Sequence, residues 1–369
     1  MRNNAGVSSS AESLRFLLIR RDNIGDLVCT TPLFRALRER FPQARIEALV
    51  NSYNAPVLEN NPDLDAVYAY TKAKHRPAGK SVLGVYWDRM QLQLHLRRSR
   101  FDYVILAAPG FQPRSLQFAR LLKPRHIVGF VEPGNSSPKI DIALPYALPR
   151  SMHETENVFR LLEPLGIAGT PPAQRVVAKR ISNGSPALYI EGGVKPLVIG
   201  VHISARKPSQ RWPMENFAKL MERLGETYNA SFLLFWSPGN EANPLHPGDD
   251  EKARRLLLLT HAKSVTPSPT DHLSQLIAGL DQCDIVICSD GGAMHVTAGL
   301  GKPILCFFGK SDATRWYPWG VPHVVLQPPG MDVIDIGVEQ AFAAFEQLLK
   351  VCQSQSMTAQ INPPSKKSG

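Results

Sequence analysis

The sequence contains little that would cross-link the chain or anchor it in a membrane. It has five cysteines among 369 residues, and none of them forms a C-x-x-C pair. Because disulfide frameworks and zinc sites use closely spaced cysteines, we expect reduced core thiols and a cytoplasmic protein. No apolar run approaches the roughly 18 residues of a membrane-spanning helix, and the first residues lack the apolar segment of a secretory leader. The composition leaves peripheral contact with a membrane surface open.

Two common phosphate-binding motifs are also missing. No G-x-G-x-x-G follows a strand-like run, and no G-x-x-x-x-G-K-[ST] occurs, so neither a dinucleotide-binding nor a P-loop site is supported. One D-x-D pattern, Asp63-Leu64-Asp65, resembles a divalent-metal site for a nucleotide sugar. It follows Pro62 in a polar turn, and turn chemistry explains it adequately. We therefore predict no metal site.

The composition that is present points to two domains and an acidic partner. The chain is 43% hydrophobic and 20% charged, and its length exceeds what one ordinary core accommodates. Its formal charge is +10, and residues 1–170 hold 23 basic and 15 acidic residues against 19 and 17 in residues 171–369. An acidic partner should therefore meet the first half. Nucleic acid is a poor candidate, because aromatic and basic residues do not interleave on one face and no known module occurs.

Short β-branched runs alternate with amphipathic segments, which is typical of parallel α/β units. In the first half we expect strands at Phe16–Ile19, Ile46–Val50, Val67–Tyr70, Tyr103–Ala107 and Ile127–Phe130. In the second half we expect strands at Val198–His202, Phe232–Trp236, Ile285–Cys288 and Ile304–Phe307. Helical spacing predicts helices around Leu33–Phe41 and at His153–Leu165, Met214–Tyr228, Asp250–Leu259, Leu273–Leu280, Gly292–Leu300 and Val338–Cys352.

This alternation predicts an α/β protein with two doubly wound, Rossmann-like domains that face a central cleft. We place the N-terminal domain at residues 14–172 and the C-terminal domain at residues 197–352. Residues 173–196, which are rich in glycine and proline, suit a linker. The polar ends, 1–13 and 353–369, are expected to be disordered. Ligands of such folds bind at the carboxyl ends of the strands, so the strand-to-helix junctions should carry the chemistry.

Asp26 lies at the first junction, Arg20–Asp26, directly after Gly25. A glycine turn leaves backbone N–H groups pointing outward, and an aspartate beside it would face the cleft at the helix entry. As an N-cap, Asp26 would stabilise the helix by about 1 kcal/mol. As a carboxylate in the cleft, it would serve as a catalytic base. The two roles are compatible.

The second junction, His202–Pro213, is a basic loop at a helix entry. Its polar residues include the hydroxyls of Ser204 and Ser209 and the cations Arg206, Lys207 and Arg211. Charge-assisted hydrogen bonds and the field of a helix N-terminus suit a diphosphate there. A solvated basic loop is the alternative. The aromatic and rigid pair Trp212-Pro213 disfavours it, because they indicate a loop held in shape.

The third junction, Ser289–His295, opens another helix. The amide groups of Gly291, Gly292 and Ala293 could contact a phosphate, because paired glycines let a ligand approach the backbone. Asp290 would instead contact a hydroxyl or an amine of the substrate. His295 is either a ligand-binding residue or an ordinary buried histidine of the core.

Three segments in this order resemble glycosyltransferase family 9. They are Arg20–Pro32 (RRDNIGDLVCTTP), His202–Pro213 (HISARKPSQRWP) and Ser289–Gly309 (SDGGAMHVTAGLGKPILCFFG). The resemblance spans about Phe16 to Leu349, and the best-known members are ADP-heptose:lipopolysaccharide heptosyltransferases of Gram-negative bacteria. It implies a GT-B fold, inversion at the anomeric carbon, no metal and no cofactor besides the nucleotide-sugar donor.

The resemblance also implies that the N-terminal domain binds the acceptor and the C-terminal domain the donor, and it implies roles for individual residues. Asp26 matches the family's general base. The donor-binding residues would be Ser204 and Ala205 at the phosphates, Asp290, Gly292 and His295 in a D-x-G-x-x-H stretch, and Glu241 at the nucleoside.

Gln210 departs from the family pattern, since a lysine that contacts the diphosphate often occupies this position. Phosphate neutralisation would then fall to Arg206, Lys207 or Arg211.

The resemblance implies transfer of heptose from ADP-heptose to an acidic lipopolysaccharide-core acceptor. In a direct displacement, Asp26 takes the proton of the acceptor hydroxyl while the basic loop and the Gly291–Ala293 amides stabilise the departing diphosphate. An acidic, lipid-linked saccharide at the inner membrane would explain the basic first half. The candidate acceptor or membrane-face residues are Arg89, Arg97 and Arg114, with Lys72, Lys74, Arg76, Lys80 and Arg98. Arg97–Arg100 is equally explained as a solvated helix end.

Three alternatives stay open. A GT-B transferase that uses another nucleotide sugar would keep the same loops. A sugar-nucleotide epimerase would share the fold but need no acceptor. A non-catalytic relative would keep the donor loop and lose the base, and the presence of Asp26 counts against it.

Overall fold

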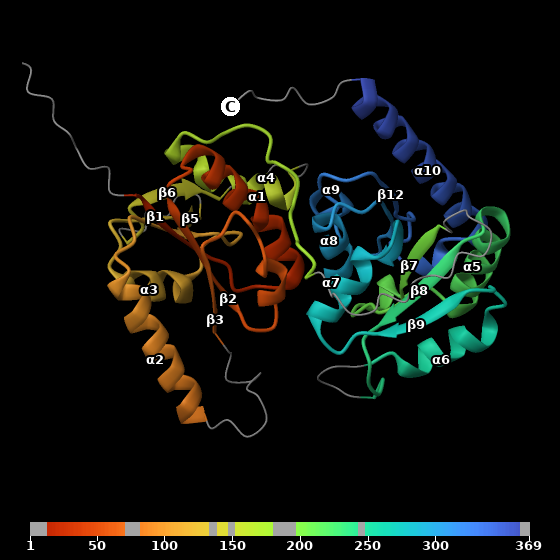
Figure 1. The fold of residues 1–369 in the computed structure, drawn as a ribbon. Coiled ribbons are helices and arrows are strands. Elements are labelled where there is room, and N and C mark those ends of the chain that lie inside the picture. The colour runs from red at the N-terminus through yellow and green to blue at the C-terminus, as the bar shows by residue number, and fades with distance from the viewer. Residues whose placement is uncertain are drawn as a thin grey trace, which may run out of the picture.

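The computed structural model describes residues 13–70, 82–132, 139–146, 152–179, 197–242 and 248–361. Most of the predicted disordered ends, 1–12 and 362–369, and the linker residues 180–196 lie outside these described residues. Within the described ranges the chain forms two six-stranded sheets with helices packed on them, and the two units lie side by side (Figure 1).

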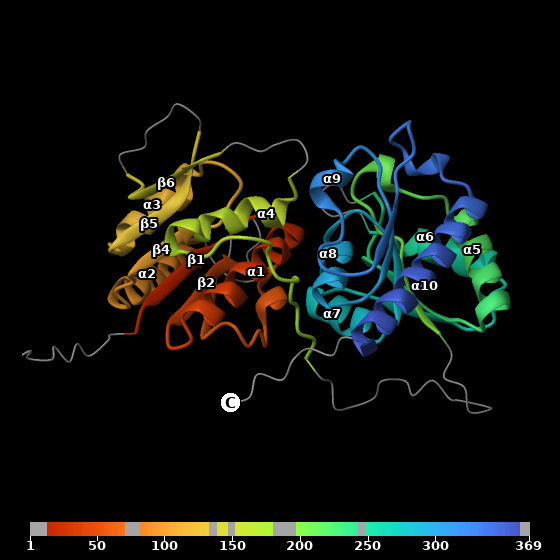
Figure 2. The same cartoon turned by 90° about the horizontal axis from the view of Figure 1, so that it is seen from above.

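The first sheet has the strand order β3-β2-β1-β4-β5-β6, and its strands are parallel. They are β1 (Arg15–Ile19), β2 (Arg45–Asn51), β3 (Ala66–Tyr70), β4 (Tyr103–Leu106), β5 (His126–Val131) and β6 (Ile142–Pro145). The helices are α1 (Ile24–Arg40), α2 (Val82–Arg98), α3 (Pro113–Leu122) and α4 (Glu154–Phe159), with the 3-10 segments η1 (Ala55–Leu58) and η3 (Arg160–Leu165). Buried contacts place α1 and α4 on one face and α2 and α3 on the other (Figure 2). Central strands covered on both faces explain the continuous apolar run of β1.

The second sheet repeats this plan in the order β12-β11-β10-β7-β8-β9. Its strands are β7 (Val198–His202), β8 (Ser231–Trp236), β9 (Val265–Pro269), β10 (Ile285–Ser289), β11 (Ile304–Phe307) and β12 (His323–Leu326). Its helices are α5 (Met214–Tyr228), α6 (Asp250–Leu259), α7 (Leu273–Asp281), α8 (Gly292–Gly299), α9 (Ala313–Trp316) and α10 (Val338–Ile361), with η4 (Pro208–Gln210) and η5 (Val333–Asp335). Buried residues of α5, α6 and α10 pack on one face, and those of α7 and α8 on the other.

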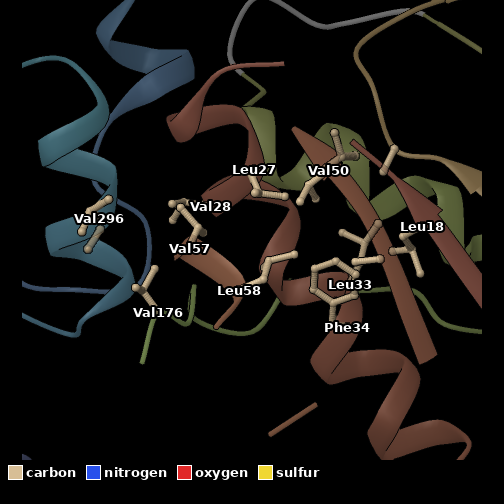
Figure 3. Packing of buried hydrophobic residues seen from close by; sticks show 14 of the residues in the cluster. Leu18, Leu27, Val28, Leu33, Phe34, Val50, Val57, Leu58, Val176 and Val296 are labelled. Atoms are coloured by element: carbon tan, nitrogen blue, oxygen red, sulfur yellow. The ribbon is translucent and has the colours of Figure 1, made fainter. Parts of the chain in front are cut away.

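The two units share an apolar core at the contact between α1 and α8. Val28 of α1 and Val57 of η1 lie opposite Val296 of α8, with Val176 beside them, and all four side chains are buried (Figure 3). The backbone N–H of Val176 also donates to the carbonyl of Gly299 at 2.7 Å. Val176, near the start of the predicted linker, therefore packs against the second unit, whereas Gln174 and Arg175 bond to Thr155 and Asp63 of the first unit.

Every strand predicted from the sequence forms, whereas β6, β9 and β12 are missed. All three lie at sheet edges. β9 contains Pro267 and Pro269, and β6 ends at Pro145. Proline lacks the N–H that a ladder needs, so it is confined mainly to such edges and weakens the strand pattern there.

The helix pattern fails in five places. The prediction misses α2, α3 and the short α9, and α2 carries few buried side chains that would set a period. The helix predicted at His153–Leu165 turns into η3 at Arg160, which contains Pro164. Proline inside a helix removes a hydrogen bond and clashes with the preceding turn. The last helix continues to Ile361, past the predicted end at Cys352. In the described part of the chain, no helix has the length and apolar character needed to cross a membrane.

Gly25 is required for the close approach of α1 to α8. A Cβ atom on Gly25 would lie 2.4 Å from Cδ2 of His295. We expect Gly25→Ala to lower the free energy of unfolding by about 1–3 kcal/mol, the usual cost of overpacking. The control is Gly225→Ala, where the nearest contact is an ordinary 3.6 Å. This change should raise stability by roughly 0.5–1 kcal/mol through helix propensity. Equal effects of both substitutions in urea unfolding would contradict the packing role of Gly25.

Candidate active site

A cavity of about 480 Å³ lies where strand-end loops of both units meet. From the first unit it is lined by Asn23, Ile24, Gly25, Asp26 and Tyr53. From the second unit it is lined by Ser204, Ala205, Arg206, Lys207, Gln210, Asp290, Gly291, Gly292, His295, Ser311 and Trp316. The three predicted junctions therefore come together in one cavity.

Asp26 holds the first turn of α1 and faces this cavity. Asn23, not Asp26, is the N-cap, so the N-cap interpretation of Asp26 is wrong in position. Oδ2 of Asp26 accepts the backbone N–H of Asn23 at 3.0 Å and its Nδ2 at 2.9 Å. A carboxylate in the first turn also suits the helix dipole. Asp26 is 9% exposed, which leaves it accessible from the cavity.

Arg20 supports Asp26 from the protein interior. Its Nη2 donates to Oδ1 of Asp26 at 2.8 Å and lies 3.3 Å from Oε1 of Glu154, and its Nη1 donates to the carbonyl of Ala107. Arg20 is 1% exposed and Glu154 is fully buried. Although burial opposes its charge, the carboxylates of Asp26, Glu154 and Asp22 keep the pKa of Arg20 above its ordinary value. The guanidinium is therefore a fixed positive charge behind Asp26.

The basic loop after β7 is held in shape, as the sequence predicts. Trp212 is buried, and its Nε1 donates to the carbonyl of Ile336 at 2.9 Å. Arg211 turns back onto the loop, where its Nε donates to the carbonyl of Ala205 at 3.0 Å. Arg206 and Lys207 are exposed and line the cavity, whereas Arg211 is absent from its lining. Positive charge in the cavity therefore comes from Arg206 and Lys207.

Gln210 connects this loop to the third junction. Its Nε2 donates to Oδ2 of Asp290 at 2.6 Å and to Oγ of Ser311 at 2.9 Å, and the side chain is buried. Lys207 Nζ also reaches Ser311 Oγ at 3.2 Å. The amide of Gln210 therefore fixes one oxygen of Asp290 without adding charge.

The third junction presents the N-terminus of α8 to the cavity. Gly291 and Gly292 line it, whereas Ala293 is buried and lies outside the lining. His295 is also buried, and this burial lowers its pKa against the opposing effect of Asp290 and Asp26. Its imidazole packs against Trp316 with ring centroids 5.9 Å apart. His295 is thus a neutral group that is both a core residue and part of the cavity wall.

Glu241 does not lie in the same cavity. It lines a second one, of about 710 Å³, together with Asn240, Asp250 and Arg254. Its carboxylate pairs with Nζ of Lys252 at 3.0 Å. The loop that carries Glu241 follows β8, and the N–H of Ser237 in that loop donates to Oγ of Ser204 at 2.8 Å.

The predicted acceptor-binding arginines separate into two groups. Arg89 and Arg114 line a groove of about 340 Å³ between α2 and α3 with Arg21, Tyr70, Tyr86 and Met90. Nη2 of Arg21 donates to Oγ of Ser115 at 2.8 Å, which ties the groove to the Arg20–Asp26 loop. Arg97 and Arg98 are exposed in the last turn of α2, outside this groove. Lys72, Lys74, Arg76 and Lys80 lie outside the described residues.

The sequence prediction misses several residues of the cavity. Tyr53 and Ser311 follow β2 and β11, so the same search of strand ends would have found them. Trp316 carries no local signal, and neither does the charged pair Glu154–Arg315 behind the cavity lining, whose atoms lie 2.9 Å apart. Across the described ranges, no group of three or more His, Cys, Asp or Glu side chains is arranged to hold a metal ion. Metal independence itself stays a prediction.

Comparison with protein families and curated proteins gives consistent matches. The model described as "Glycosyltransferase family 9 (heptosyltransferase)" matches residues 89–329. Lipopolysaccharide heptosyltransferase 3 of Escherichia coli K12 is 24% identical over 303 residues, covering 80% of this chain and 82% of the relative. Lipopolysaccharide heptosyltransferase 2 of Salmonella typhimurium LT2 is 24% identical over 310 residues, covering 81% and 84%.

Solved structures match the fold of both units together. A family 9 glycosyl transferase from Veillonella parvula superposes with a TM-score of 0.70 at 21% identity, covering 91% of this chain and 97% of the other. The E. coli heptosyltransferase WaaC with ADP gives a TM-score of 0.72 at 17% identity, covering 91% and 100%. The prediction of a GT-B fold with two Rossmann-like domains is confirmed.

Proposed function

Since the chain belongs to glycosyltransferase family 9, we propose that it transfers heptose from ADP-heptose to an acidic lipopolysaccharide-core acceptor, with inversion and without a metal. The similarity to lipopolysaccharide heptosyltransferases 2 and 3 supports this donor and acceptor. The observation that carries the proposal is the 480 Å³ cavity, where Asp26 of one unit faces Arg206, Lys207 and the α8 N-terminus of the other.

Asp26 is the proposed general base. Each carboxylate oxygen has two lone pairs, so Oδ1 can accept the acceptor hydroxyl in addition to Arg20. The acceptor oxygen attacks the anomeric carbon and forms the new glycosidic bond, its proton passes to Asp26, and the bond to ADP breaks. Attack opposite the leaving group inverts the anomeric carbon.

The second unit is the proposed site of the departing ADP. Arg206, Lys207 and the amides of Gly291 and Gly292 stabilise the negative charge that grows on the diphosphate, with Ser204 and Ala205 beside it. Asp290, held by Gln210, is placed to bind a sugar hydroxyl. Because Gln210 supplies no charge, Arg206 and Lys207 replace the lysine of the family pattern.

The nucleoside is proposed to lie toward the end of β8. There the hydrogen bond from Ser237 to Ser204 connects the cavity to the loop that carries Glu241. Glu241 remains a proposed contact of the nucleoside.

The groove between α2 and α3 is the proposed acceptor site. Arg89 and Arg114 suit acidic groups. Arg21 also lines the groove and is adjacent in sequence to Arg20, the partner of Asp26. Exposed apolar side chains surround it, with Tyr86 at 56%, Trp87 at 57% and Leu121 at 46% exposed. Aromatic and basic residues together suit the headgroup region of a membrane, so this face is proposed to contact the membrane that carries the acceptor.

Replacing the base tests the mechanism. We expect Asp26→Asn to lower kcat by at least about a thousandfold, while the Kd for ADP stays within about twofold, because the base is lost and the leaving-group site remains. Retained turnover in this variant, measured with purified acceptor, would refute the role of Asp26. Thermal unfolding controls for loss of the helix capping bonds that Asp26 makes to Asn23.

Calorimetric titration tests the donor and the absence of a metal. We expect ADP-heptose to bind at least about tenfold more tightly than UDP- or GDP-sugars, and EDTA to leave the Kd and the turnover unchanged. Tighter binding of another nucleotide would keep the glycosyltransferase and discard the heptose donor. Consumption of the donor at the full rate without acceptor would instead favour an epimerase, and loss of turnover in EDTA would refute metal independence.

A charge reversal tests the acceptor groove. We expect Arg89→Glu to raise the KM for the acceptor about tenfold or more and to leave the KM for the donor unchanged, since an ion pair becomes a repulsion. Arg97→Glu is the matched control, because Arg97 is exposed on the same helix outside the groove. If both substitutions have the same effect, general attraction by the basic face explains the result and the groove is not the site.

A further inference from the structure

Four charged side chains of alternating sign form a chain behind the cavity. Asp26 pairs with Arg20 at 2.8 Å, Arg20 with Glu154 at 3.3 Å, and Glu154 with Arg315 at 2.9 Å. Asp26, Arg20 and Glu154 belong to the first unit, whereas Arg315 lies on α9 of the second unit. The charge that faces the cavity is therefore connected to the opposite domain.

Burial makes this chain sensitive to the loss of any member. Arg20 and Glu154 are almost completely buried, and Arg315 is partly buried. Glu154 accepts Arg20 at Oε1 and Arg315 at Oε2, so two guanidinium groups share its charge. A buried carboxylate that loses one partner competes more strongly for the other. Without Arg315, Glu154 would draw Arg20 away from Asp26.

Neighbouring contacts hold α9 in register with α4. His153 accepts the N–H of Thr155 at Nδ1, which leaves the proton on Nε2 to donate to the carbonyl of Tyr317 at 2.8 Å. Burial lowers the pKa of His153 to about 4, so this bond persists in neutral form at physiological pH. Arg315 also precedes Trp316, which lines the cavity. The ion pair across the domains thus forms beside the proposed donor site.

We propose that Glu154 and Arg315 are positioning residues that act on Asp26 through Arg20. Contact between the domains would then determine how strongly Arg20 pairs with the carboxylate of Asp26. The inference rests on the proposed role of Asp26 and extends it to two residues outside the cavity lining. Neither residue touches the substrate. Their effect is electrostatic and passes through one shared guanidinium.

Other charged or titratable groups also face Asp26 or its partners. They are Asp22 of the same loop, Cys29 of α1, Tyr53 after β2 and His295 of α8, with Arg206 facing Tyr53 and Asp290 facing His295. Tyr146 after β6 and His153 before α4 face Arg315. These groups are unchanged in the variants below. A shift of the pH profile between variants therefore reports on Glu154 and Arg315.

The two substitutions should move the profile in opposite directions. Glu154→Gln leaves the whole charge of Arg20 to Asp26, which favours the carboxylate and lowers the acid-limb pKa of kcat/KM. Arg315→Gln leaves the charge of Glu154 uncompensated near Asp26, which raises the acid-limb pKa of kcat/KM. We expect the acid-limb pKa to move by about half a pH unit or more in each direction. The double variant should return close to the wild-type value, because both charges are removed together.

The experiment measures kcat/KM against pH for the full-length protein with ADP-heptose and purified acceptor. Arg315→Lys, which keeps the charge, should restore the wild-type profile. Arg255→Gln, which breaks an exposed ion pair with Glu215 outside the cavity lining, is the control and should leave the pH profile unchanged. The Kd for ADP should stay within about twofold throughout, since binding energy is not what these residues supply.

The outcomes separate a positioning role from a purely structural one. Opposite shifts with recovery in the double variant support positioning. Equal losses of kcat with no shift, or a double variant worse than either single one, would mean a purely structural ion pair and overturn the inference. If Asp26→Asn proves fully active, the proposed base fails. If Asp26→Asn is inactive and the profiles do not move, only this inference fails.

Discussion

The close approach of α1 and α8 is the constraint on which the site depends. Gly25 has no side chain at the point where His295 comes nearest, and that absence lets the N-termini of the two helices lie side by side. Both helices begin at the carboxyl ends of central strands, β1 and β10. The one contact therefore brings a carboxylate from one sheet and an amide-rich turn from the other to the same cavity. A side chain at this position would push the two helix N-termini apart, and with them the carboxylate and the amide-rich turn that the two sheets supply.

The central part of the fold was predictable from the sequence because burial on both faces leaves a clear pattern. Strands such as Val198–His202 and Ile304–Phe307 are short apolar runs between turns, and the structure has them with the predicted bounds. Edge strands such as β9 lack that pattern, since they are half exposed and contain prolines. The same reasoning applies to α2, where exposed Trp87 and Met90 obscure any helical period. Local pattern thus predicts what the core encloses and misses what lies at its margin.

The candidate site was predictable where its residues follow strands directly. Lys207 and Gly292 lie together because the parallel strands of the second sheet end on the same side, and Asp26, which follows a strand of the first sheet, lines the same cavity. Sequence could not show that Arg211 folds back onto its own loop, since that depends on the geometry of a carbonyl at Ala205. Nor could it show Glu154 beside Arg315, because a buried pair so distant along the chain has no spacing rule. Contacts that form only when the domains assemble cannot be predicted from local sequence patterns.

The apolar core that runs across both units has a consequence for dissecting the protein. Val28 and Val57 of the first unit and Val296 of the second belong to one cluster, so cutting the chain between the sheets would expose buried apolar surface on each fragment. The burial of such a side chain contributes roughly 1.5–3 kcal/mol. Separate fragments should therefore associate with each other through the exposed apolar surfaces. The intact chain should unfold in one cooperative transition. The two Rossmann-like domains thus repeat one architecture but are expected to unfold together.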